Sequence, residues 1–172
     1  MTITKGASPT DLSPDPAFDR LLGTLQQMTT APIMLPATLP PQLEKVAITG
    51  TRGDTYTILF LTPNAPDDLI QSNIHAYVHG WLTAQPASTP LNDPRRSNYT
   101  VTQLGTVTLP NGTIANVTRL DPPEGANYGT QIEGTFEEGS ERYTIHIESI
   151  DTPDGDLVRK MLSTMVKVPK KE

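Results

Sequence analysis

The sequence predicts an α+β fold in which two main helices pack on an antiparallel β-sheet, after a short N-terminal helix and a disordered tether. Apolar and polar residues alternate over residues 44–60 and again after residue 99, which is typical of half-buried strands. Elsewhere apolar residues recur every three or four positions, as in amphipathic helices. Short turns such as Asn111-Gly112 join successive strands, and this favours antiparallel pairing.

The N-terminal part divides into a tether, a helix and an extended ribbon. Residues 1–14 carry few apolar side chains, so we expect them to be disordered. Asp15 and Pro16 suit the N-cap and first position of a helix over residues 16–28. Prolines at every fourth position over residues 32–41 remove the amide donors that helices and central strands need. We expect this ribbon to pack along the edge of the domain.

A hairpin and a long helix are predicted next. Residues 44–60 have period-two patterning, with a turn at residues 50–54. Asp67 and Asp68 then offer an N-cap and favourable charge to a helix that extends to Leu82. The apolar face of this helix would consist of Ile70, Ile74, Tyr77, Val78, Trp81 and Leu82. We expect it to be the first of the two main helices.

The C-terminal half predicts strands and a closing helix. A surface loop over residues 85–97 precedes strands at 99–104, 106–109, 113–120, 129–136 and 142–149. Asp154 or Asp156 would cap the last helix. The segments that begin at Tyr56 and Tyr143 both run from Tyr-Thr-Ile to Thr-Pro and then to an acidic residue. Either this is the usual composition of strand-to-helix turns, or the two segments form a pseudo-symmetric pair.

Composition excludes several classes of protein. The chain has 172 residues, no cysteine and a net charge of -6, so residues 15–169 suit a single domain, with 170–172 as a frayed tail. The negative charge argues against nucleic acid as a partner, and no apolar run is long enough for a transmembrane segment. Thiol catalysis and cysteine zinc sites are excluded. We find no nucleophile-elbow or phosphate-loop motif, and we expect no cofactor.

The composition favours a location outside the cytoplasm. The chain has 25 threonines and only six lysines, and its first 16 residues resemble a tether rich in Thr, Ser and Pro. A secreted domain, or the soluble part of a lipoprotein whose lipid anchor lies outside this sequence, would have this composition. The alternative is a cytoplasmic protein with a frayed tail.

The order of elements also carries a topological resemblance. The features that carry it are the Leu-Pro pairs at Leu35-Pro36 and Leu39-Pro40, the Asn111-Gly112 hairpin, the strand from Tyr143 and the helix that contains Met161. With these features, the chain resembles the PsbP-like superfamily over roughly residues 32–168. The start of the ribbon also looks like uncharacterised domains of bacterial envelope lipoproteins. The resemblance implies an α+β sheet fold, and it carries over no functional residue and no photosystem role.

Two groups of residues are candidates for a site. His75 and His79 stand four apart on the predicted helix, where two imidazoles on one side can hold zinc or copper; solvated side chains are the alternative. Arginines and aromatic residues are the usual anchors of protein interfaces. The candidate interface consists of Tyr77, Trp81, Arg95, Arg96 and Tyr99. The third histidine, His146, would point away from the apolar face of its strand, either exposed or beneath a covering helix.

Together these observations predict a non-catalytic, extracytoplasmic binding or scaffolding module with a protein partner. A carrier of a small apolar ligand is the first alternative. Its pocket would be lined by Tyr56, Ile58, Phe60, Trp81, Tyr143 and Ile145. A metal-assisted hydrolase that uses His75 and His79 is the second.

Overall fold

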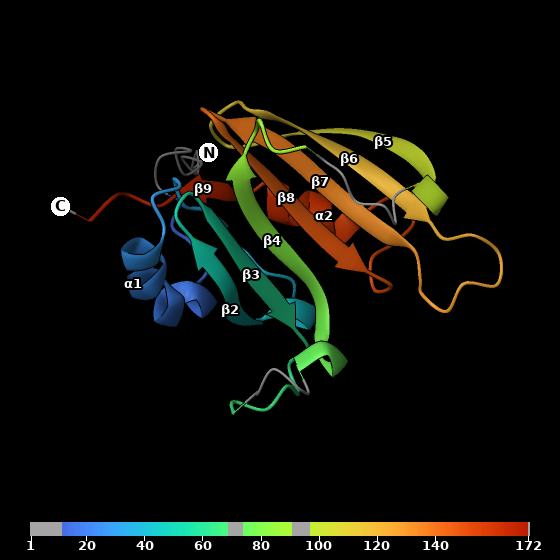
Figure 1. Ribbon diagram of the computed structural model, residues 1–172, viewed down its shortest axis with the longest axis horizontal. Helices are drawn as coiled ribbons and strands as arrows, with labels where there is room; N and C mark the ends of the chain where they lie inside the picture. Colours follow the sequence, from blue (N-terminus) through green and yellow to red (C-terminus); the bar gives the residue numbers. More distant parts are fainter. Residues whose placement is uncertain (1–11, 69–73, 91–96, 172) are drawn as a thin grey trace, which may run out of the picture.

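The computed structural model describes residues 12–68, 74–90 and 97–171 (Figure 1). These residues form a seven-stranded antiparallel sheet, a two-stranded sheet and two α-helices, which confirms the predicted α+β fold class. Arg95 and Arg96, most of the predicted tether and Glu172 lie outside the described residues. No helix in the described ranges is long and apolar enough to cross a membrane.

The large sheet has the strand order β2-β3-β4-β8-β7-β6-β5, so β2 and β5 are its two edges. Its strands are β2 (Lys45–Arg52), β3 (Thr55–Leu61), β4 (Val78–Pro86), β5 (Thr100–Thr108), β6 (Ile114–Asp121), β7 (Gln131–Glu138) and β8 (Glu141–Glu148). The small sheet pairs β1 (Met34–Pro36) with β9 (Met165–Lys167). Each sheet therefore contains a pair of neighbouring strands that lie far apart in the sequence, β4 with β8 and β1 with β9.

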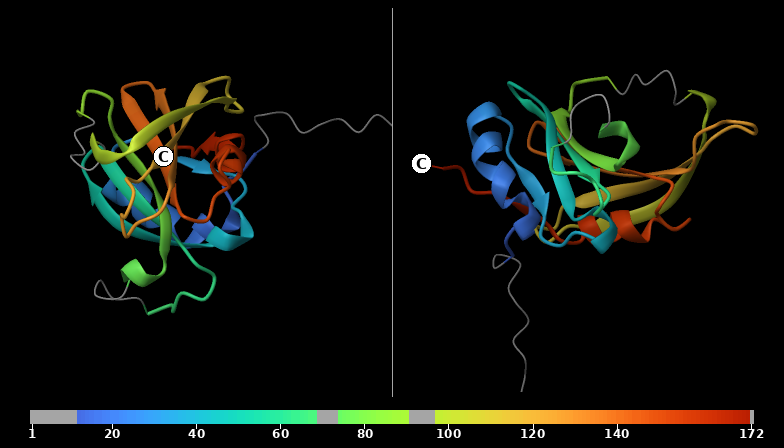
Figure 2. Two further views of the ribbon diagram at one scale, coloured as in Figure 1. Left: turned by 90° about the vertical axis from the view of Figure 1, so that its right-hand side faces the viewer. Right: turned by 90° about the horizontal axis from the view of Figure 1, so that it is seen from below.

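The main core lies on one face of the large sheet, which we call the inner face. The helix α2 (Asp156–Leu162) packs there, and α1 (Asp19–Met28) lies beside the β2 edge (Figures 1 and 2). A side chain at Gly134 would place its Cβ 2.6 Å from Leu162 Cδ1 and 2.7 Å from Val158 Cγ1. Glycine at this position therefore allows α2 to approach β7 closely.

The predicted helical segment over residues 16–28 and the extended ribbon after it are confirmed. The Asp15 carboxylate accepts a hydrogen bond from the Ala17 amide at 2.9 Å and caps a 3-10 turn that leads into α1. The proline-rich ribbon is extended and its β1 segment is buried. The Tyr56 hydroxyl accepts from the Met34 amide at 3.0 Å and donates to the Met34 carbonyl at 3.1 Å, which fixes the ribbon against the core.

The predicted helix up to Leu82 is wrong. Ile70 lies outside the described residues, and the described part of this segment forms one 3-10 turn, η4 (Ile74–Ala76), which β4 follows at once between β3 and β8. Gly80, Leu82 and Ala84 alternate into the inner face, and a Cβ at Gly80 would lie 2.2 Å from the His146 carbonyl oxygen. Two neighbouring strands supply backbone hydrogen bonds along β4, so tertiary pairing overrides the local helical spacing.

Two smaller predictions are also corrected. Residues 99–104 and 106–109 form one strand, β5, with an irregularity at Gly105, whose φ of 102° favours glycine. The helix α2 is capped from further away than expected, by Asp151 in place of Asp154 or Asp156. The two oxygens of the Asp151 carboxylate accept hydrogen bonds from the Leu157 and Val158 amides at 2.8 and 3.1 Å.

Candidate functional site

The second face of the large sheet, which we call the outer face, carries no α-helix among the described residues (Figure 2). Figure 1 looks onto this face, with α2 behind the sheet. A row of directly paired residues crosses it from strand to strand. In order, these are Ala47, Leu59, Trp81, His146, Glu133, Thr118 and Gln103. The row is apolar over β2 to β4 and polar from β8 onwards.

The centre of this row is a stacked pair of rings. The Trp81 and His146 ring centroids lie 4.0 Å apart at an interplanar angle of 12°. Although it is on the outer face, His146 is only 4% exposed. Its Nδ1 lies 3.3 Å from Glu133 Oε1, and its Nε2 lies 3.3 Å from Glu148 Oε1. An ionised carboxylate only accepts hydrogen bonds, so this arrangement is satisfied fully when both ring nitrogens carry protons.

This geometry determines how readily His146 takes up a proton. Burial of His146 opposes its charged form, but the hydrogen bonds to Glu133 and Glu148 outweigh burial and raise the pKa of His146 above its ordinary value. The Glu133 side chain is 12% exposed and that of Glu148 is 41% exposed. The interaction with Glu133 is therefore the less screened of the two.

The polar half of the outer face forms a connected network. The Gln131 side-chain amide donates to Glu148 Oε1 at 3.3 Å and to the Tyr99 hydroxyl at 2.8 Å. Tyr99 in turn contacts Tyr128, with ring centroids 5.5 Å apart. The network extends from His146 to the segment that enters β5.

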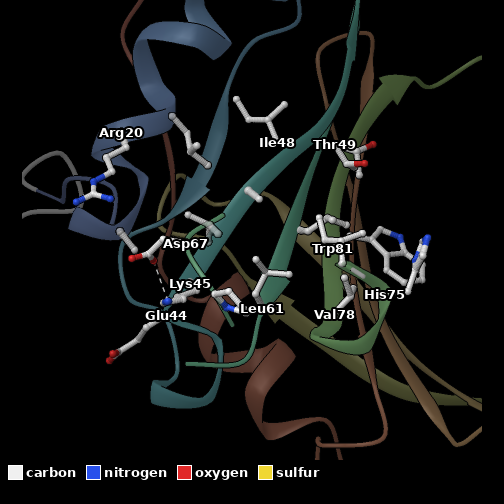
Figure 3. Close-up of a pocket in the computed structure, with 18 of the residues that line it drawn as sticks. Arg20, Glu44, Lys45, Ile48, Thr49, Leu61, Asp67, His75, Val78 and Trp81 are labelled. Carbon is white, nitrogen blue, oxygen red and sulfur yellow. Dashed lines mark hydrogen bonds and ion pairs between the residues drawn. The ribbon is translucent and has the colours of Figure 1, made fainter. Parts of the chain in front are cut away.

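The apolar half borders a groove of about 1000 Å³, which we call the β2 groove (Figure 3). Leu59, Leu61 and Ala65 form a small apolar cluster, separate from the main core, against which Trp81 and Tyr77 pack. The same groove continues around the β2 edge to Ala17, Arg20 and Leu21 at the start of α1. It thus presents an apolar floor with charged groups at its rim.

The structure separates the predicted interface residues. Tyr77 and Trp81 lie together in the small apolar cluster, whereas Tyr99 stands at the far side of the outer face. Trp81 and Tyr99 are connected by a chain of contacts across the outer face, from Trp81 through His146, Glu148 and Gln131 to Tyr99.

The premise of the metal-site prediction is wrong, because His75 and His79 share no helix. His75 is exposed on η4 and lines the β2 groove, and His79 falls at the point where the register between β3 and β4 skips a residue. Over the described ranges, no three His, Cys, Asp or Glu side chains come close enough to hold a metal ion. The proposed carrier lining also differs, since Tyr56, Ile58, Phe60, Tyr143 and Ile145 pack in the main core while Trp81 lies on the opposite face.

Sequence reasoning missed the importance of His146 and its two carboxylates. The alternation in β8 correctly placed His146 away from the Tyr143 face, but a helix does not bury it. Its partners are Trp81 from β4 and Glu133 from β7, and only the strand order brings these together. The one local signal was Glu148, two positions along the same strand and hence on the same face.

Comparisons of the chain with protein-family models, with curated proteins and with solved structures find no match. The resemblance to the PsbP-like superfamily therefore stays a prediction, and the function is argued from the geometry of the outer face.

Proposed function

We propose that the protein is a non-catalytic binding module that holds a protein partner in the β2 groove. The observation that carries this proposal is the position of Trp81, which stands between the apolar floor of the groove and the polar network around His146. Tryptophan in such a position contributes much of the energy of protein interfaces, because it combines a large apolar area with few rotatable bonds.

The rigidity of the surroundings supports the same conclusion. His146 holds one face of the Trp81 ring, and His146 is itself held by carboxylates on both ring nitrogens. A side chain fixed in this way loses little conformational entropy when a partner binds. A location outside the cytoplasm, for example as part of a lipoprotein, belongs to the same proposal and is supported by the threonine-rich composition.

The packing of the inner face favours a binding module over a carrier. Tyr56, Ile58, Phe60, Tyr143 and Ile145 are each at most 1% exposed and belong to one packed cluster. A carrier would need these side chains to surround a cavity of the size of its ligand.

Site-specific photo-crosslinking tests the proposal. Benzoyl-phenylalanine replaces Thr49, an exposed residue that lines the groove, and in a second variant it replaces Thr106, an exposed threonine on the opposite edge strand β5. In the cells that produce the protein, we expect position 49 to crosslink one defined protein that position 106 does not. Mass spectrometry identifies the adduct.

The identified partner is then purified and titrated against the full chain. Ala47→Glu places a charge on the apolar floor and should weaken binding at least about tenfold, which corresponds to about 1.4 kcal/mol. Thr106→Glu adds the same charge at the far edge and should leave the affinity unchanged. Equal crosslinking from both positions, or equal affinity of the two glutamate variants, would contradict the proposal.

A further inference from the structure

The edge strand β2 offers backbone groups to an additional strand. In the described part of the chain, the side of β2 away from β3 is bridged only at its end, where Thr29 pairs with Gly53 and the Thr30 amide donates to the Gly53 carbonyl at 2.8 Å. On this side, the regular part of the strand, from Lys45 to Ile48, pairs with no other strand of the described residues and lines the β2 groove, whose opposite wall is the start of α1. Such an edge is a ready template for strand addition.

The side chains of β2 are apolar toward both faces of the sheet. Val46 and Ile48 lie on the inner face and pack only partly against the main core, while Ala47 lies on the outer face beside Leu59. The β2 groove extends to both faces, with Leu21 on one side and Trp81 on the other. A strand added here would bury apolar side chains in both directions.

The charges at the rim identify the preferred end group. Lys45 donates to Asp67 at 3.0 Å, and this hydrogen bond holds the pKa of Asp67 below its usual range. Arg20, on the α1 side of the groove, forms no hydrogen bond or ion pair with the described residues (Figure 3). The charge of Arg20 also helps to lower the pKa of Asp67, but the two groups form no direct ion pair, so a carboxylate of the occupant could make with Arg20 the contact that Asp67 does not make.

The same charges disfavour a second copy of this chain as the occupant. Lys45 and Arg52 are the first and last residues of β2. Antiparallel pairing of two full-length β2 strands would place Lys45 of each copy opposite Arg52 of the other. Like charges directly opposite one another destabilise a strand pair, and lysine at an edge commonly prevents this contact.

We propose that an extended segment of the partner adds to the edge of β2 as an eighth strand, with apolar side chains on both of its faces and an acidic residue against Arg20. This inference rests on the proposed function and specifies its partner. Backbone hydrogen bonds to β2 would supply affinity, and the Trp81 side of the groove would select side chains.

Peptide selection tests the mode of binding. A phage library of random twelve-residue peptides is panned on the full chain, and selected peptides are titrated while the emission of Trp81, the only tryptophan, is recorded. We expect peptides with β-branched residues and at least one Asp or Glu, and each should change the emission. A selection that gives no peptide able to perturb Trp81 overturns the inference.

Backbone methylation separates strand addition from other modes. Each selected peptide is made in two forms, N-methylated at alternate residues in the two possible phases. An added strand directs only every second amide toward β2, so one form should lose binding at least about tenfold while the other keeps the parent affinity. An equal loss of affinity in the two methylated forms overturns strand addition. Because only the peptide is changed, the protein keeps its fold in this test.

A matched pair of variants tests the charge. Arg20→Gln should weaken an acidic peptide about fivefold, as expected for an ion pair worth about 1 kcal/mol, and should not affect the analogue with Gln in place of the acidic residue. Arg52→Gln, at the other end of β2, is the control and should change neither. If the crosslinker at position 49 captures a partner but no peptide passes the methylation test, this inference fails and the proposed function stands. If the crosslinker at position 49 captures no partner, the proposed function itself fails.

Discussion

The His146 network predicts that the protein loses stability as pH rises through the raised pKa of folded His146. Because the carboxylates of Glu133 and Glu148 raise the pKa of His146, the folded state binds a proton more tightly than the unfolded state. The stabilisation is fully present below the unfolded pKa of about 6.5 and is lost as pH rises through the folded pKa. Over that interval the free energy of unfolding should fall by up to about 1.4 kcal/mol per pH unit.

The variant His146→Gln isolates this effect, because glutamine stays polar but carries no charge. Hydrogen bonds to charged groups contribute about 1.5–3 kcal/mol each, and the exposed Glu148 contributes at the low end. Together with the lost stack on Trp81, we expect the variant to be about 2–4 kcal/mol less stable than the parent at pH 6. The difference should shrink as pH rises through the folded pKa of His146.

Urea unfolding followed by Trp81 emission measures both proteins at matched pH values, and NMR titration of the His146 ring gives its pKa directly. Glu133→Gln should lower that pKa more than Glu148→Gln, since Glu133 is the more buried carboxylate. A titration midpoint below 6.5 in the parent, or a stability difference that does not change with pH, would refute the reasoning.

Three further predictions concern the fold, and thermal or urea unfolding measures each. Gly134→Ala should destabilise the protein by about 1–3 kcal/mol, because the new Cβ would clash with α2. Gly23→Ala, in α1 where a Cβ would have nothing within 4 Å, should stabilise it by about 0.5–1 kcal/mol. A change of the same sign in both variants would contradict this account. Asp151→Ala should cost about 1 kcal/mol through loss of the α2 cap, and an equal loss in Asp154→Ala would show that Asp151 is not the cap. Tyr56→Phe removes two buried hydrogen bonds to β1 and should cost about 1–3 kcal/mol, and a variant as stable as the parent would mean that the ribbon is held by packing alone.

Local patterns were sufficient where neighbouring residues decide the conformation. Asp15 and Pro16 begin the first helical segment because a side-chain cap and a fixed φ act within one turn. Prolines predicted the extended ribbon for an equally local reason. The period-two pattern placed Val46 and Ile48 against the core, and this assignment depends only on the alternation of a strand.

Residues 67–82 show where such patterns fail. Their apolar residues fit helical spacing, but the part from Val78 onwards also alternates at Gly80, Leu82 and Ala84. Local sequence does not choose between the two periods. The choice follows from β3 and β8, which bind β4 on both sides and leave no room for a side chain at Gly80.

By itself, then, the sequence determined the α+β class, the N-terminal helix, the ribbon and most strands, because each depends on the preference of a short segment. It also determined that His146 lies on the opposite face from Tyr143. Only the tertiary structure decided that the His146 ring stacks on Trp81, that Glu133 flanks this ring, and that the β2 groove borders the same face. These relations depend on strand order and register, and the pairing of β4 with β8, which brings Trp81 to His146, joins residues more than 50 positions apart. Local sequence patterns do not specify such a pairing.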